Sequence, residues 1–92
     1  MPMDLTVDGA TLVDEADFHA RIREASGVTW YGGRLDALFD LLVAVVDRPI
    51  SLSITNAAAA RKVIGERFDR ILTVIFDAIA ERPGAIMFKL ES

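Results

Sequence analysis

The strongest constraint on the fold is the order of strand-like and helix-like segments along the chain. Residues 3–7 and 50–54 alternate apolar and polar side chains, and residues 85–90 are mostly apolar, which is typical of β-strands. Helical patterns fill both gaps between them, so both connections are predicted to be βαβ crossovers. The sequence therefore predicts a small two-layer α/β domain, with a three-stranded parallel sheet covered on one face by about four helices.

The helices are predicted from apolar residues at helical spacing and from residues that favour helix ends. Asp14 is expected to cap the first helix, with Asp17 as its capping-box partner, and Asn56 is expected to cap the third. Asp8 and Gly9 predict a turn after the first strand. The expected helices span residues 15–25, 33 or 34 to 46, 57 to 63 or 64, and 66–81.

Composition favours one soluble globular domain over residues 1–92, because 52% of the residues are hydrophobic and 26% are charged. The absence of cysteine and of a secretory signal pattern fits a cytoplasmic protein. The longest strongly apolar run, residues 41–46, is too short to cross a membrane. A net charge of −4 and a pI near 4.8 argue against a nucleic-acid partner and fit a basic protein partner.

Two aspartates mark the outer face of the second predicted helix. Asp36 and Asp40 lie one turn apart, where like charges repel each other by a few tenths of a kcal/mol. The positions three and four residues away hold glycine, alanine, valine and phenylalanine, so neither acid has a local cation. One interpretation involves no binding role: Asp36 complements the helix dipole and Asp40 adds solubility. From the pattern alone, this interpretation and a binding role remain open.

Catalysis by these two carboxylates is not expected. Paired acids act as general acid and base only where a pocket shifts the pKa of one of them, and adjacent turns of an exposed helix offer no such pocket. Two carboxylates are also an incomplete ligand set for Ca²⁺ or Mg²⁺. The sequence therefore predicts a protein that is not an enzyme and that holds no metal or cofactor. His19, the one histidine, is expected to be a satisfied surface or boundary residue.

Residues 31–40, which read Tyr-Gly-Gly-Arg-Leu-Asp-Ala-Leu-Phe-Asp, resemble the signature of the barstar family. That family consists of intracellular inhibitors of the secreted ribonuclease barnase and typically reads Tyr-Tyr-Gly-x-Asn-Leu-Asp-Ala-Leu-Trp-Asp at this place. Weaker similarity covers the rest of the chain, including residues 17–19, Pro49 and residues 77–81. The resemblance implies the strand order 1-2-3 and a loop-and-helix surface that plugs a ribonuclease active site.

The resemblance also implies a role for each residue of this surface. Asp40 matches the acid that enters the phosphate-binding site, and Asp36 matches a second acid paired with an arginine. Trp30 takes the place of a tyrosine that lies against the catalytic histidine, although a role in closing the loop over the core is the alternative. Gly32 matches a backbone contact, and Asp77 matches an acid in a peripheral ion pair.

Arg34 departs from the family pattern, because it replaces the usual asparagine and puts a cation beside the acids. We count it among the expected partner-binding residues, and it hints at a related but different target. The resemblance implies an immunity protein that forms a 1:1 complex with a basic ribonuclease or related toxin. The alternative is an acidic interaction module with a basic partner that is not a nuclease. We expect a monomer, although the apolar arc around Phe76 leaves a homodimer open.

Overall fold

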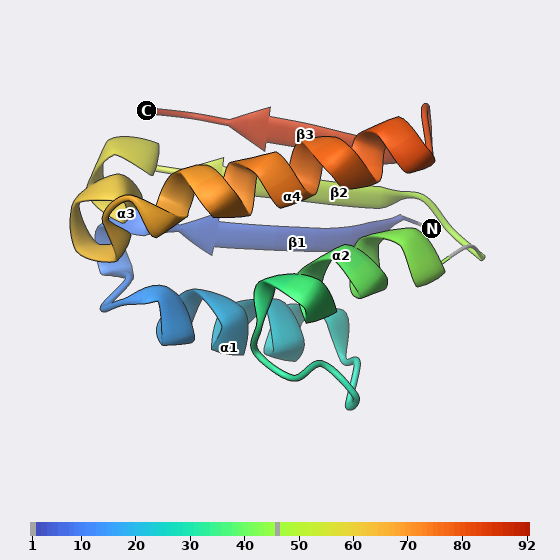
Figure 1. Ribbon diagram of the computed structural model, residues 1–92, viewed down its shortest axis with the longest axis horizontal. Coiled ribbons are helices and arrows are strands. Elements are labelled where there is room, and N and C mark those ends of the chain that lie inside the picture. Colours follow the sequence, from blue (N-terminus) through green and yellow to red (C-terminus); the bar gives the residue numbers. More distant parts are fainter. Residues whose placement is uncertain (1, 46) are drawn as a thin grey trace.

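Three parallel strands form one sheet in the order β1-β2-β3: β1 (Met3–Asp8), β2 (Ile50–Thr55) and β3 (Ile86–Leu90) (Figure 1). The computed structural model describes residues 2–45 and 47–92. Leu5 of β1 lies opposite Leu52 of β2, which lies opposite Phe88 of β3. Two helices follow β1 and two follow β2, so the predicted fold class, strand order and double crossovers are confirmed.

The helices begin and end close to the predicted residues. Asp14 caps α1, since its carboxylate accepts a hydrogen bond from the Asp17 backbone N–H at 2.8 Å. The predicted capping box is wrong in one detail. The Asp17 carboxylate accepts a hydrogen bond from the Val13 N–H at 3.0 Å and not from the Asp14 N–H. The elements are α1 (Glu15–Ser26), α2 (Leu35–Ala44), α3 (Ala57–Ile64), α4 (Arg67–Glu81) and a short 3₁₀ helix, η1 (Gly9–Thr11).

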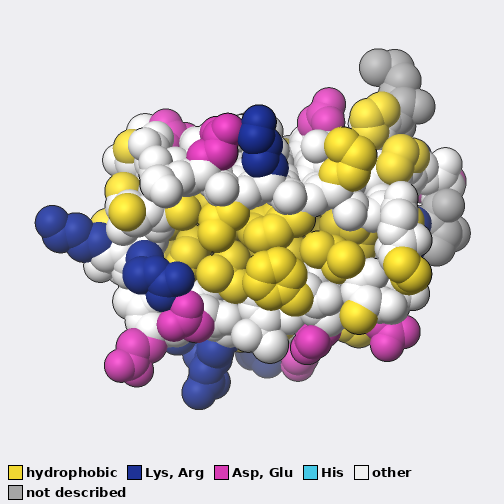
Figure 2. Space-filling view, turned by 90° about the horizontal axis from the view of Figure 1, so that it is seen from above, with side chains coloured by type: hydrophobic (Ala, Val, Ile, Leu, Met, Phe, Trp, Pro, Cys, Tyr) yellow, Lys and Arg dark blue, Asp and Glu magenta, His cyan; other side chains and the backbone are white. Residues whose placement is uncertain are grey.

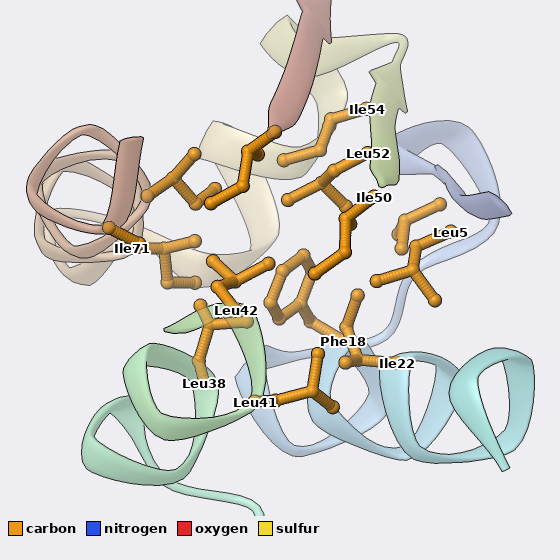
Figure 3. Close-up of a cluster of buried hydrophobic side chains, with 14 of the residues drawn as sticks. Leu5, Phe18, Ile22, Leu38, Leu41, Leu42, Ile50, Leu52, Ile54 and Ile71 are labelled. Atoms are coloured by element: carbon orange, nitrogen blue, oxygen red, sulfur yellow. The ribbon is translucent and has the colours of Figure 1, made fainter. Parts of the chain in front are cut away.

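The alternation along the strands separates a covered face of the sheet from an open one. On β2, Ile50, Leu52 and Ile54 are fully buried, whereas the serines between them and the threonine after them are only half-buried. Parallel sheets are usually covered on both faces and then read as continuous apolar runs. Helices on one face explain the alternating sequence. Figure 3 shows the strand side chains meeting those of the helices, among them Phe18, Ile22, Leu38, Leu41, Leu42 and Ile71.

The C-terminal end of α2 differs from the prediction. The helix ends at Ala44 with Val45 as its cap, whereas the apolar pattern predicted a helix through Val46, a residue that lies outside the described part of the chain. The Arg82 guanidinium donates to the carbonyl oxygen of Leu42 at 2.9 Å and also to that of Val45. Basic side chains can satisfy the last carbonyls of a helix in this way. A residue from beyond α4 thus supports the end of α2.

Asn56 precedes α3 as predicted, but its side chain does not cap the helix. The residue adopts a left-handed conformation with φ +51°, and its amide donates to the Asp8 carboxylate at 2.7 Å. The same carboxylate accepts from the Ala10 N–H at 2.9 Å, so Asp8 begins η1 where a simple turn was expected. This contact joins the C-terminal ends of β1 and β2.

Part of the apolar surface of α4 is not covered. Phe76 is 54% exposed, and its ring packs edge-on against that of Phe88 on β3, with a centroid distance of 5.8 Å. Figure 2 shows hydrophobic side chains gathered on this side of the molecule, where α4 and β3 lie. The apolar arc therefore exceeds what the core buries. A monomer remains our prediction for the oligomeric state. None of the described helices has the length and apolar character needed to cross a bilayer.

We expect the addition of a single methyl group at Gly9 to destabilise the fold. A Cβ atom at this buried glycine would lie 2.2 Å from the Asn56 carbonyl oxygen and 2.9 Å from the Ala60 Cβ atom. We predict that Gly9→Ala lowers the free energy of unfolding by about 1–3 kcal/mol, as overpacking does. The matched control is Gly32→Ala, because nothing lies within 4 Å of its Cβ position. Urea denaturation measures both, and equal stabilities would contradict this packing.

Candidate partner-binding surface

An open hollow of about 460 Å³ gathers five of the six residues that the sequence suggested for partner binding. It lies where the loop after α1 enters α2, and Asp77 is the predicted residue that does not line it. Asp77 is exposed on α4, the helix that packs against α2. The lining residues are Trp30, Gly32, Arg34, Asp36, Ala37 and Asp40.

The buried side of α2 determines which residues of this helix face the solvent. Leu38, Leu41 and Leu42 are fully buried, and burying each such side chain contributes about 1.5–3 kcal/mol. The helical period then turns Asp36 and Asp40 outward, and both are exposed. Phe39 is half-buried and packs against the core.

The two glycines before α2 have different functions. Gly33 has φ +75°, in the left-handed region that side chains other than glycine rarely adopt, so it provides the turn into the helix. Gly32 has no such conformation, and no atom lies within 4 Å of the position its Cβ would take. The missing side chain at Gly32 therefore leaves room in the hollow and exposes the backbone. This accessible backbone suits the contact implied by the resemblance.

The charges of the hollow have no partners among the described residues. Neither Asp36 nor Asp40 takes part in an ion pair or a side-chain hydrogen bond there, and the same is true of Arg34 at the helix N-terminus. Elsewhere, Asp17 is paired with Arg21 at 3.0 Å. The hollow thus offers two carboxylates and one guanidinium that are exposed and that no described residue pairs with.

Trp30 adds an apolar element to this charged surface. Its side chain is 54% exposed, so about half of its surface is available to a partner, and its binding role stays a prediction beside the alternative of closing the loop. The next residue, Tyr31, is buried, with 3% exposure. The loop therefore presents one aromatic ring to the solvent and anchors the other inside the protein.

A buried hydrogen-bond network holds Tyr31. The Tyr31 hydroxyl lies 2.5 Å from Nδ1 of His19, and Nε2 of His19 lies 3.1 Å from the Glu15 carboxylate. Arg67 of α4 donates to the same carboxylate through Nε and, at 3.2 Å, through Nη2. The expectation of a surface or boundary position for His19 is wrong, since it is 2% exposed, but both of its ring nitrogens are satisfied. The sequence missed this network because its members come from three separate segments.

Burial and charge determine the protonation of Tyr31 and Glu15. Burial raises the pKa of the Tyr31 phenol, and the negative charge of Glu15 raises it further, so the side chain stays a hydroxyl. The hydrogen bond from Arg67 is the main cause that lowers the pKa of Glu15, and the bond to His19 adds to it. Glu15 is therefore a carboxylate, which only accepts hydrogen bonds, and Nε2 of His19 donates to it.

No group of three histidine, aspartate or glutamate side chains within the described ranges is arranged to hold a metal ion.

The charged hollow combines acids that no described residue pairs with, an exposed aromatic ring and an accessible backbone. Of these, the aromatic ring is of a type that is enriched in protein interfaces, and the partner-binding role of the hollow stays a prediction.

Comparison with known families places the chain in one of them. Residues 3–91 match the barstar family, described as "Barstar (barnase inhibitor)", and the chain therefore belongs to this family. Members of the family are inhibitors and not enzymes. A search of curated proteins found no match.

The lowered pKa of Glu15 predicts how stability depends on pH. A carboxyl whose pKa is lower in the folded state stabilises the protein above its unfolded pKa, near 4.5, and loses this effect as the pH falls through the folded value. Above about pH 5.5, we expect the free energy of unfolding of wild type to exceed that of Glu15→Gln by a constant amount. Below about pH 4.5, we expect this difference to be smaller. Urea denaturation between pH 3 and 7 measures the difference. A difference that grows as the pH falls would contradict the assignment.

Proposed function

We propose that this protein inhibits a basic ribonuclease by inserting the loop after α1 and the start of α2 into its active site. Exposed, unpaired Asp36 and Asp40 beside Trp30 are the observation that carries the proposal. Membership of the barstar family supports it. In this proposal the protein is a cytoplasmic immunity protein that binds its target one to one.

The chemistry of a ribonuclease site explains why carboxylates would block it. Such a site must bind the phosphates of RNA, so it concentrates arginine and lysine side chains. Carboxylates bind arginine through charge-assisted hydrogen bonds, which are roughly twice as strong as neutral ones. Asp36 and Asp40 lie one helical turn apart, with Cβ atoms about 5–6 Å from each other, so each can meet a separate cation. The pair thereby imitates successive phosphates of an RNA strand.

The other residues of the hollow supply shape and anchoring. Trp30 provides the aromatic contact that protein interfaces favour, and Gly32 allows the partner to approach the backbone. The net charge of −4 favours encounter with a basic protein, an effect for which barnase and barstar are themselves a standard example. Asp77, outside the hollow, would contribute only a peripheral ion pair.

Arg34 is the observation that favours a second candidate function. Its guanidinium lines the same hollow as the two acids, so a partner that meets Asp40 must also accommodate a cation. A partner with an acid at this place fits better than a uniformly basic site. The alternative is therefore an acidic interaction module that binds a basic protein other than a nuclease.

The central test compares Asp40→Asn with Asp77→Asn in an inhibition titration. Barnase serves as the first probe, followed by any ribonuclease captured from the source cells and their medium. We predict that Asp40→Asn raises the inhibition constant about 100-fold, because breaking a buried charge pair costs about 3 kcal/mol and 1.4 kcal/mol is a factor of ten. Asp77→Asn, which removes a peripheral pair, should raise it less than about tenfold.

Two results would contradict the proposed function. Equal inhibition by wild type and Asp40→Asn would show that the acid does not enter the active site. A tight complex with a basic protein that has no nuclease activity, weakened by Asp40→Asn, would support the alternative module. Wild-type thermal stability of both variants is the control for folding.

A further inference from the structure

The loop that forms one side of the hollow has little backbone bonding of its own. Among the described residues, one backbone amide in the range 29–33 donates a hydrogen bond to a backbone carbonyl. It is the Tyr31 N–H, which donates to the Val28 carbonyl. Its length of 3.5 Å is at the weak end of the range. Something other than the backbone must therefore define the conformation of this loop.

The Tyr31 side chain is the contact that the loop makes with the rigid part of the protein. It is buried between two exposed neighbours, Trp30 and Gly32, both of which line the hollow. Its hydroxyl meets His19 of α1 at 2.5 Å, and the two rings lie 5.7 Å apart between centroids. Loss of this contact would release the residues on either side of Tyr31.

His19 connects the loop to two helices through an ordered series of donors and acceptors. Glu15 only accepts, so His19 donates to it through Nε2. In the neutral imidazole, Nδ1 is then an acceptor and accepts a hydrogen bond from the Tyr31 hydroxyl. Arg67 of α4 also donates to the Glu15 carboxylate, through Nη2 at 3.2 Å and through Nε. Both ring nitrogens of His19 are satisfied in this arrangement, and the bond to Nδ1 holds the Tyr31 hydroxyl against α1.

We infer that His19 is a positioning residue for the partner-binding loop, holding Tyr31 so that Trp30 and Gly32 take their places in the hollow before a partner arrives. The inference rests on the proposed function only in taking this loop as the binding loop. A preformed loop strengthens binding because a partner need not select a minor conformation. His19 itself is buried and touches no partner.

The test measures backbone order in the free protein by ¹⁵N relaxation, for wild type and Tyr31→Phe. This substitution removes only the hydroxyl that His19 binds. We expect the order parameters of Trp30, Gly32 and Gly33 to fall from about 0.85 toward 0.6 or below, with those of α4 unchanged. Thr73→Val is the matched control, because it removes a hydroxyl that bonds to Asp69 within α4. This control should leave the loop unchanged.

Binding to barnase, used as the probe, gives the second reading. If the competent loop conformation falls to about a tenth of the population, the Kd of Tyr31→Phe rises about tenfold. A less ordered loop in a protein that never binds barnase would support the positioning role and count against barnase as the target. Unchanged loop order in Tyr31→Phe would overturn the positioning role, whatever the binding data show.

A second variant covers the case in which Tyr31→Phe does not fold. His19→Gln keeps a polar side chain that can reach Glu15 or Tyr31 but not both, so the same loss of order confined to the loop is expected. Loss of thermal stability without any change in loop order would mean that His19 only packs the core, and would overturn the inference.

Discussion

The burial of one side of α2 is the constraint on which the rest of the site depends. Leu38, Leu41 and Leu42 are fully buried between the sheet and the neighbouring helices, which together contributes several kcal/mol. The repulsion between Asp36 and Asp40 amounts to a few tenths of a kcal/mol. Packing therefore dominates, and the helix holds two like charges side by side in the solvent, with no ion pair to either acid among the described residues.

The two parts of this surface are held in different ways. The acids lie on α2, and the aromatic ring lies on the loop before it. α2 is fixed by its core contacts and by Arg82, which satisfies carbonyls at its C-terminal end. The loop before it has few backbone bonds and relies on Tyr31 and its contact with His19. Two different kinds of interaction thus support the two halves of one hollow.

Local patterns in the sequence were sufficient for the strands and helices, and the resemblance supplied the strand order. Alternation along β2 and helical periodicity along α4 reflect burial directly, so the predicted strands and helices agree with the structure. The strand order implied by the resemblance also agrees with it. Contacts between distant segments left no such signal. His19 reads as an ordinary helical histidine until Tyr31 and Arg67 are brought to it, and Arg82 gives no sign that it ends another helix.

The most direct test of phosphate imitation is the pattern of inhibition against RNA concentration, measured in steady state with the target ribonuclease. If Asp36 and Asp40 occupy the phosphate sites, substrate and inhibitor exclude each other, and the apparent inhibition constant rises in proportion to the RNA concentration above its KM. An inhibition constant that does not change with RNA concentration would show that the acids bind elsewhere, and would contradict the account.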